Sequence, residues 1–277
     1  MKIAFCTCVQ LGLSCIQKIH DLGGKFDLFI TLNDDIAKKK SGRIYLNDIS
    51  KKSDTQLLKV NHINDTIVIK TLKKLEIDWL FLIGWSQIAS VDVLNSCKSG
   101  VIGAHPTLLP IGRGRAAIPW AIIKGLNKTG VTFFKMDEGV DTGNILGQIE
   151  IDIDKKETSG TLYEKVNLAH EDLIKNIWPD LIENKLKHTV QDDKKATFWP
   201  GRKPKDGKII PKEMTINQVD RLVRATTKPY PGAFIIDEKN NKKIIWEGTK
   251  NLNVNGVEIE CKDGIFIATK TETIEIK

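Results

Sequence analysis

The sequence predicts an α/β fold: a Rossmann-like, mostly parallel sheet flanked by helices, with a small carboxyl-terminal β-rich subdomain. Three observations lead to this prediction. The chain starts with a strand–helix–strand pattern, and a continuous apolar run at residues 78–85 is typical of a buried central strand. Near residue 190 the pattern changes to short strand segments separated by turns. We therefore expect two domains, residues 1–190 and residues 191–277.

The amino-terminal pattern is that of a βαβ unit. Residues 2–8 (KIAFCTC) and 26–32 are apolar strand patterns, and residues 11–22 between them have apolar residues at helical spacing. The turn after the first strand reads TCVQLGLSC and contains no G-x-G-x-x-G, and no G-x-x-x-x-G-K-[ST] loop follows. Dinucleotide-dependent redox chemistry and P-loop chemistry are therefore not expected.

The later elements continue this alternation. We expect strands near residues 131–136 and 148–153, and helices over residues 64–75, 116–124 and 160–186, the last kinked or interrupted by Pro179. In the carboxyl-terminal third we expect a helix over residues 215–225. Strand patterns there cover residues 233–236, 243–246, 257–261, 265–269 and 273–276.

Composition narrows the class of protein. The net charge of +7 comes mostly from lysine and mildly favours anionic ligands, although such a composition is more often a solvated surface. The basic loop at residues 33–43 fits phosphate or RNA backbone, but it has no interleaved aromatic residue, so we favour a solvated loop. The five cysteines lack paired or zinc-type spacing, so neither a disulfide framework nor a metal site is expected. The sequence shows no signal peptide and no membrane-spanning run, which predicts a cytoplasmic protein.

Residues 100–147 contain the chemically most informative pattern. A short apolar strand ends at His105, and a loop rich in glycine and arginine follows it. A second strand ends near Met136 and leads into DEGVDTGN, which contains Asp141. Ligands of open α/β sheets bind where strands end, so we expect His105 and Asp141 to face one crevice. The alternative is a strand-end histidine capped by a loop carboxylate.

These two segments resemble the folate-dependent formyltransferases, which include methionyl-tRNA formyltransferase, glycinamide ribonucleotide formyltransferase and the sugar N-formyltransferases. The matching motifs are HPTLLP from His105, with Arg113 and Gly114, and M-D-x-G-x-D-T-G from Met136. Two carboxyl-terminal strings, ATFW…R-x-P-x-D-G and RATTKPYPGAF, resemble the sugar N-formyltransferases in particular. The resemblance covers nearly the whole chain.

The resemblance implies roles for individual residues. His105 and Asp141 correspond to two members of the family's catalytic trio, and Gly103 stands where the family has asparagine. The residues expected to bind the folate are Gly84, Trp85, Ser86, Gln87, Ile88, Val140 and Asp141. Those expected to contact the acceptor are Thr107, Arg113, Gly114, Arg115 and Arg202. The co-substrate would be N10-formyltetrahydrofolate, with no metal, and the family pattern also suggests a homodimer.

Formyl transfer to a primary amine needs an unprotonated amine, a stabilised oxyanion and a proton for the leaving folate nitrogen. His105 is suited to exchanging protons at neutral pH, and Asp141 would orient the imidazole and accept the amine proton. Gly103 removes a donor worth about 3 kcal/mol of transition-state stabilisation. We expect a backbone N–H, Gln87 or Thr107 to replace it, and Gly103→Asn to leave activity equal or higher.

The leading hypothesis is transfer of a formyl group to a nucleotide-linked amino sugar, for glycan or surface polysaccharide biosynthesis. Nucleic acid and membranes are not expected partners. The alternatives are methionyl-tRNA formylation, hydrolysis of the folate to formate, and a non-catalytic folate or sugar-nucleotide binding protein, which the glycine at position 103 suggests.

Overall fold

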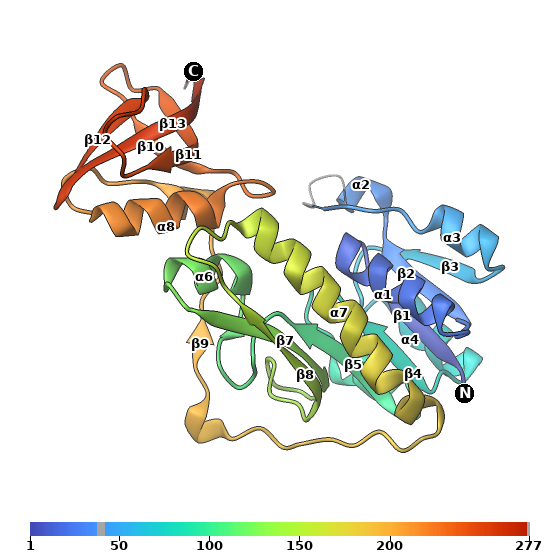
Figure 1. The fold of residues 1–277 in the computed structure, drawn as a ribbon. Helices are drawn as coiled ribbons and strands as arrows, with labels where there is room; N and C mark the ends of the chain where they lie inside the picture. Colours follow the sequence, from blue (N-terminus) through green and yellow to red (C-terminus); the bar gives the residue numbers. More distant parts are fainter. Residues whose placement is uncertain (38–41, 276–277) are drawn as a thin grey trace. The chain divides into compact units, whose positions relative to one another are not determined.

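The computed structural model describes residues 1–37 and 42–275, and its contacts separate them into two compact units (Figure 1). Unit 1 comprises residues 1–113, 130–151 and 166–198. Unit 2 comprises residues 114–129, 152–165 and 199–277. Two segments from the amino-terminal two-thirds of the chain therefore group with the carboxyl-terminal residues. The domain boundary expected from the sequence at residues 190/191 stays a prediction.

A seven-stranded sheet with the order β3-β2-β1-β4-β5-β7-β8 forms the centre of unit 1. Its first five strands pair in parallel, as the βαβ pattern predicts. The strands are β1 (Ile3–Cys6), β2 (Leu28–Leu32), β3 (Gln56–Val60), β4 (Trp79–Leu82), β5 (Gly100–His105), β7 (Lys128–Lys135) and β8 (Ile145–Asp152). Strands β1, β2 and β4 are buried along their whole length, which explains their continuous apolar sequences.

Strand β7 runs antiparallel to β5, with His105 opposite Thr132 and Ile102 opposite Lys135. The residue that follows β7, Met136, therefore lies beside Val101 near the start of β5 and not beside its carboxyl end. The sequence-based expectation that two strand ends bring His105 and Asp141 together is wrong in this respect. The loop after β7 makes the approach instead.

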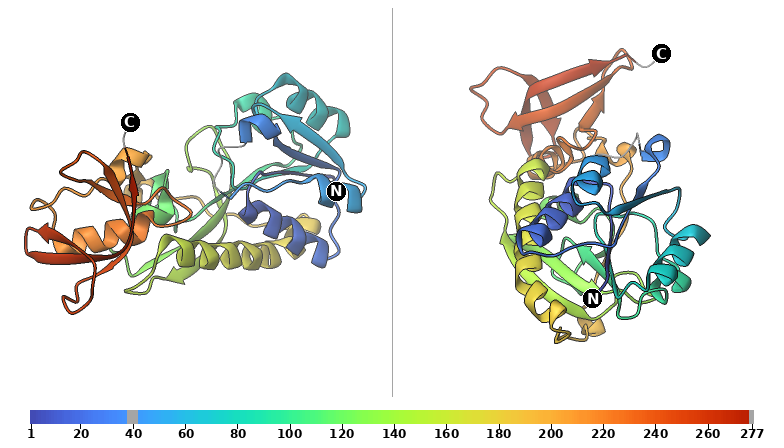
Figure 2. Two further views of the ribbon diagram at one scale, coloured as in Figure 1. Left: turned by 90° about the horizontal axis from the view of Figure 1, so that it is seen from above. Right: turned by 90° about the vertical axis from the view of Figure 1, so that its right-hand side faces the viewer.

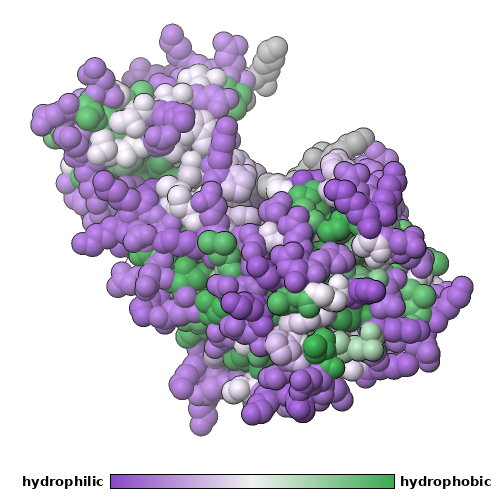
Figure 3. Space-filling model, turned by 45° about the vertical axis from the view of Figure 1, so that its right-hand side comes forward, coloured by the Kyte–Doolittle hydropathy of each residue, from purple (hydrophilic) through white to green (hydrophobic). Residues whose placement is uncertain are grey.

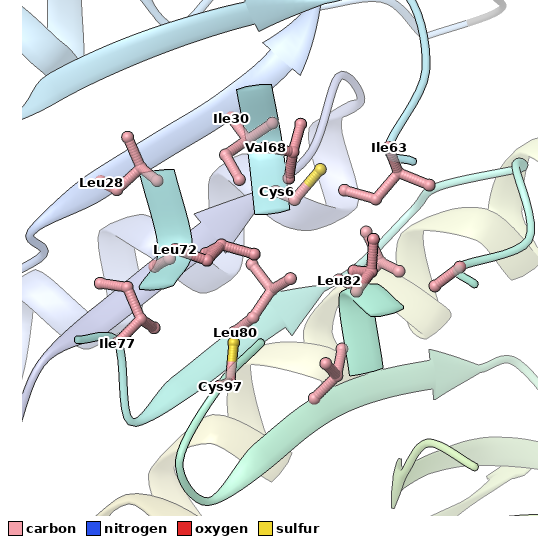
Figure 4. Close-up of a cluster of buried hydrophobic side chains, with 14 of the residues drawn as sticks. Cys6, Leu28, Ile30, Ile63, Val68, Leu72, Ile77, Leu80, Leu82 and Cys97 are labelled. Carbon is pink, nitrogen blue, oxygen red and sulfur yellow. The ribbon is translucent and has the colours of Figure 1, made fainter. Parts of the chain in front are cut away.

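Helices cover both faces of this sheet. Figure 2 shows α1 (Gln10–Asp21) and α7 (Ser159–Ile182) on one face and α4 (Thr66–Leu75) on the other. The α4 face holds a cluster of buried aliphatic side chains and two cysteines (Figure 4), among them Cys6, Leu28, Ile30, Val68, Leu72, Leu80, Leu82 and Cys97. Shorter helices are α2 (Asp34–Ala37), α3 (Asn47–Lys52) and α5 (Val91–Leu94). The two faces bury enough apolar surface to make the sheet a rigid support for the loops at its edge.

Unit 2 contains a four-stranded antiparallel sheet with the order β10-β11-β13-β12. Its strands are β10 (Ala233–Ile236), β11 (Lys242–Thr249), β12 (Val257–Cys261) and β13 (Gly264–Ile274), and its helices are α6 (Ala117–Ile123) and α8 (Ile216–Thr226). A two-stranded pair is formed by β6 (Arg113–Gly114) and β9 (Phe198–Trp199). The segments 265–269 and 273–276, expected as separate strands, belong to one long strand as far as Ile274.

Polar residues occupy most of the molecular face in Figure 3, with small apolar patches between them. Within residues 1–37 and 42–275, none of the helices has the length and apolar character that crossing a membrane requires. The basic segment at residues 38–41, part of the loop considered for phosphate or RNA, lies outside the described residues. Arg43 at its end bonds Thr31 Oγ1 and the carbonyl of Leu32.

Candidate active site

His105 is the last residue of β5 and is 6% exposed. Its Nε2 lies 2.8 Å from the carbonyl oxygen of Gly112, in the loop that follows. A carbonyl can only accept, so Nε2 carries the proton in this arrangement. The other ring nitrogen, Nδ1, is therefore the one that can gain or lose a proton.

Asp141 provides the carboxylate that faces this nitrogen. The loop begins beside β5, where Met136 N donates to Val101 O, and returns to β7, where Lys135 N donates to Asn144 O. Between these points it reaches His105, and Asp141 Oδ2 lies 3.5 Å from Nδ1. The side chains are 8% and 16% exposed, for His105 and Asp141 respectively, so the pair is shielded from water. The two side chains lie close together, as predicted. The role of this pair in catalysis stays a proposal.

Burial determines what this pair can do chemically. With Nε2–H held by Gly112, a proton on Nδ1 makes the imidazole cationic and places that charge next to the Asp141 carboxylate. Solvent screens such a contact weakly at this degree of burial. The arrangement can therefore exchange one proton between Nδ1 and a reacting group while the carboxylate compensates the charge.

Gly103 lies on the same strand, two residues before His105, and Met136 occupies the space beside it. A Cβ at Gly103 would meet Met136 Cγ at 2.9 Å, Phe134 Cζ at 3.0 Å and Met136 Sδ at 3.1 Å. The missing asparagine is thus accompanied by a methionine that fills part of the volume. This packing changes what we expect of Gly103→Asn, because the new side chain needs Met136 to move.

The two side chains considered as substitutes for the missing amide lie in different surroundings. Gln87 Oε1 accepts hydrogen bonds from Ile63 N at 2.9 Å and from Trp85 Nε1 at 3.2 Å, and its Nε2 donates to Asn61 O at 2.9 Å. The Gln87 amide therefore joins two loops. Thr107 is 1% exposed, and its Oγ1 has no hydrogen-bond partner among the described residues. Replacement of the amide by either side chain stays a prediction.

The loop after β4 and the loop after β7 carry the residues expected to bind the folate. Gly84 has φ +67°, a conformation that suits glycine, and Trp85 packs on the buried cluster of the α4 face. Ser86 is exposed, and Ile88 and Val140 are 72% and 46% exposed. The contacts of these residues with a folate stay a prediction.

A pocket of about 350 Å³ opens between α5 and the end of β7 in unit 1. Its lining includes Val91, Leu94, Gly100, Met136 and Glu138. None of the residues expected to bind folate lines it, although four of its lining residues, 135–138, directly precede Gly139 and Val140. Sequence reasoning missed α5 as part of a candidate ligand site, because four residues are too few for a periodic signal.

The three arginines expected to bind the acceptor differ in their surroundings. The Arg113 side chain is 11% exposed and bonds Gln191 Oε1 and Asp193 Oδ1. Arg115 is exposed and follows Gly114 in the two-stranded pair, where its backbone N–H donates to Trp199 O. The Arg113 guanidinium is thus engaged within the protein, whereas Arg115 is open to solvent.

Arg202 lines a separate pocket of about 140 Å³ within unit 2, together with Pro119, Lys203, Thr226 and Tyr230. Its guanidinium carbon lies 5.0 Å from the centre of the Trp120 ring. Burial lowers the pKa of Arg202 and raises the pKa of Tyr230 to about 12, so both keep their usual protonation at neutral pH. The pocket therefore offers a cation, a phenol and apolar surface.

The cysteines offer no reactive or metal-binding site. All five are free and buried. Burial raises the pKa of Cys6 and Cys15, and that of Cys97 to about 11, so these thiols stay protonated at neutral pH. No group of histidine, cysteine and carboxylate residues suited to a metal ion occurs in the portion of the chain that the structure describes.

Two family models give the class of protein to which this fold, with its histidine–aspartate pair at the carboxyl end of β5, belongs. The family model for formyl transferases matches residues 14–177, and the model for the formyl transferase carboxyl-terminal domain matches residues 202–277. The chain therefore belongs to the formyl transferase family.

Individual relatives agree with this assignment. The chain is 36% identical over 264 residues to the bifunctional polymyxin resistance protein ArnA of Wigglesworthia glossinidia brevipalpis. The aligned region covers 91% of this chain and 39% of that relative. The chain thus spans about two-fifths of the length of this relative.

Solved structures share the fold at low sequence identity. The N-formyltransferase of Helicobacter canadensis, solved with folinic acid and dTDP-3-aminofucose, has a TM-score of 0.75 at 17% identity and covers 98% of this chain and 100% of its own. A 4-N formyltransferase of Francisella tularensis has a TM-score of 0.70 at 22% identity, and the match covers 99% of this chain and 98% of that enzyme. Methionyl-tRNA formyltransferase of Clostridium thermocellum has a TM-score of 0.64 at 19% identity, covering 100% of both chains.

Proposed function

We propose that this protein transfers a formyl group from N10-formyltetrahydrofolate to the primary amine of a nucleotide-linked amino sugar. The observation that carries the proposal is the shielded pair of His105 Nδ1 and Asp141 Oδ2, 3.5 Å apart, on a chain that belongs to the formyl transferase family. Support for a sugar acceptor comes from the carboxyl-terminal sequence strings and from the sugar N-formyltransferases among the solved structures of similar fold.

The residues present supply the proton transfers that the reaction needs. His105 Nδ1 takes one proton from the attacking amine, and the Asp141 carboxylate compensates the charge of the imidazolium that forms. The cationic imidazole then stabilises negative charge on the formyl oxygen and returns its proton to the leaving nitrogen. For His105 Nε2–H to act on that oxygen, it must leave the carbonyl of Gly112.

The co-substrate supplies a formyl group bound to a nitrogen that can leave after protonation. We propose that the exposed side chains of Ile88 and Val140 form part of its binding surface, and that the 350 Å³ pocket beside Val91 extends it. Exposed apolar side chains such as these suit contact with an aromatic ligand.

For the acceptor we propose the unit 2 pocket that contains Arg202 and Tyr230 as the place of the nucleotide. A guanidinium held over the Trp120 ring suits a phosphate or an aromatic base. We expect Arg202→Ala to raise KM for the acceptor and to leave KM for the folate unchanged. Equal changes in both would contradict this assignment.

The deciding experiment follows the ultraviolet change as N10-formyltetrahydrofolate becomes tetrahydrofolate, with a panel of nucleotide-linked amino sugars and with initiator methionyl-tRNA. Turnover with an amino sugar that vanishes in His105→Ala and Asp141→Asn supports the proposal. Turnover with tRNA alone would assign the protein to translation initiation. Folate binding without turnover would indicate a binding protein, and folate loss without an acceptor would indicate hydrolysis to formate. Cytoplasmic location and a homodimer stay predictions.

A further inference from the structure

Gln191 is buried in a segment that is otherwise open to solvent. It is 7% exposed, whereas Asp192, Asp193 and Lys194, which follow it, are all exposed. Burial of an uncharged amide costs free energy unless its polar atoms are bonded. The bonds of this side chain therefore indicate why it is buried.

The Gln191 amide uses both of its ends. Its Nε2 donates to the carbonyl oxygens of Asp141 at 2.9 Å and Gly143 at 2.7 Å. Its Oε1 accepts from Arg113 Nε at 3.2 Å and Nη2 at 2.8 Å. A side-chain amide has two donors and two acceptor positions, and Gln191 uses all four.

The contacts on the nitrogen side hold a strained residue. Asp141 has φ +56°, in the left-handed region that non-glycine residues adopt at a cost. Such a conformation persists only where surrounding contacts determine it. Gln191 bonds the carbonyl of Asp141 itself and that of Gly143, so it holds the backbone of the loop where the carboxylate is attached.

The contacts on the oxygen side lead to the histidine. Arg113 directly follows Gly112, whose carbonyl oxygen lies 2.8 Å from His105 Nε2. A closed chain of contacts therefore runs from His105 through Gly112 and Arg113 to Gln191, and from Gln191 through Asp141 back to His105 Nδ1. All of its members belong to unit 1.

We propose that Gln191 is a positioning residue that sets the distance and direction between the Asp141 carboxylate and His105 Nδ1. The proposal rests on the proposed function only in that formyl transfer uses this pair. A purely structural glutamine, which ties the segment after α7 to the body of unit 1, would affect stability without affecting the pair.

The test uses three variants of the full chain. Gln191→Leu removes all four bonds. Gln191→Glu keeps an oxygen for Arg113 but places a second oxygen against the two carbonyls, so it isolates the contacts on the Asp141 side. Gln148→Leu is the matched control, because Gln148 Nε2 also donates two bonds, to Leu109 O and Thr132 Oγ1 at 2.8 Å each.

The first readout is independent of any substrate. In protein labelled with ¹⁵N at histidine, we expect Gln191→Leu to move the His105 ring signals in the same direction as Asp141→Asn does. The signals are assigned with His105→Asn, and Gln148→Leu should leave them in place. Unchanged His105 signals in Gln191→Leu would overturn the proposal, even if the protein transferred no formyl group to any acceptor.

The second readout is turnover. We expect both Gln191 variants to lower kcat by about 10- to 100-fold, with little change in either KM, because misplacement of a reacting group affects the chemical step. Gln148→Leu should lower the melting temperature without this loss of kcat. Wild-type kcat in Gln191→Glu would mean that only the Arg113 contact matters, which also overturns the proposal.

Discussion

Gly103 of β5 and the Met136 side chain share one volume. A Cβ at Gly103 would lie 2.9 Å from Met136 Cγ, and Met136 is the first residue of the loop that carries Asp141. The sequence-based expectation for Gly103→Asn considered only the missing hydrogen-bond donor. The structure adds a steric effect of opposite sign.

We therefore expect Gly103→Asn to lower stability by about 1–3 kcal/mol, the usual effect of overpacking, and to lower turnover by displacing the Asp141 loop. Gly103→Asn combined with Met136→Ala should recover both, because the smaller side chain makes room. Urea unfolding and kcat of the two single variants and the double variant form the measurement. If the losses of stability and kcat in the two single variants simply added in the double variant, the two side chains would not compete for one volume.

His170 on α7 shows how burial within an element determines the protonation of a side chain. It is 1% exposed, its Nδ1 bonds the carbonyl of Val166, and its ring packs edge-on against Phe133. Burial lowers its pKa from 6.5 to about 4. His170 is thus a buried packing residue between α7 and the sheet.

This shift makes stability depend on pH. Between pH 6.5 and 4 the unfolded chain binds a proton that the folded chain does not, so stability falls as the pH is lowered through this range. From pH 7 to pH 5 we expect a loss of about 2 kcal/mol from this residue. His170→Phe should remove that part of the pH dependence in urea unfolding. Substitution of the exposed His188 is the control, and an unchanged pH dependence in His170→Phe would contradict the assignment.

Helix α8 begins with a capping box in which Thr215 Oγ1 accepts from Gln218 N and Gln218 Oε1 accepts from Thr215 N. We expect Thr215→Ala to destabilise unit 2 by about 1 kcal/mol, whereas Thr215→Ser, which keeps the hydroxyl, should change little. Hydrogen exchange of the α8 amides measures the effect. Equal exchange in the two variants would show that packing on the sheet alone holds the helix.

Short elements were the ones that sequence patterns missed. The strand β3 and the helices α2, α3 and α5 contain four to six residues each, too few for periodicity to stand out. The long helices were predicted well, although α7 continues past Pro179 as far as Ile182 without the expected interruption. The antiparallel direction of β7 also depends on pairing with β5, which local sequence does not specify.

The protein carries a net charge of +7, so its binding to anionic acceptors depends on salt. The steepness of this dependence distinguishes the two candidate acceptors. A nucleotide sugar contains two phosphates. Binding of tRNA neutralises many phosphates and therefore depends steeply on salt. We expect KM for the amino sugar to rise by no more than about 10-fold between 50 and 200 mM salt, at roughly two phosphate contacts. A rise on the order of 1000-fold would instead indicate a polyanionic acceptor.

Local sequence was enough to predict the family, the α/β class and the meeting of His105 with Asp141, because motifs and hydrophobic patterns within short segments carry these features. The way in which the two residues meet depends on tertiary contacts. The approach depends on a loop that folds back along β5, on Met136 beside Gly103, and on Gln191, which lies 50 residues after Asp141. Contacts at such separations arise only when the chain packs, so local sequence carries no signal for them.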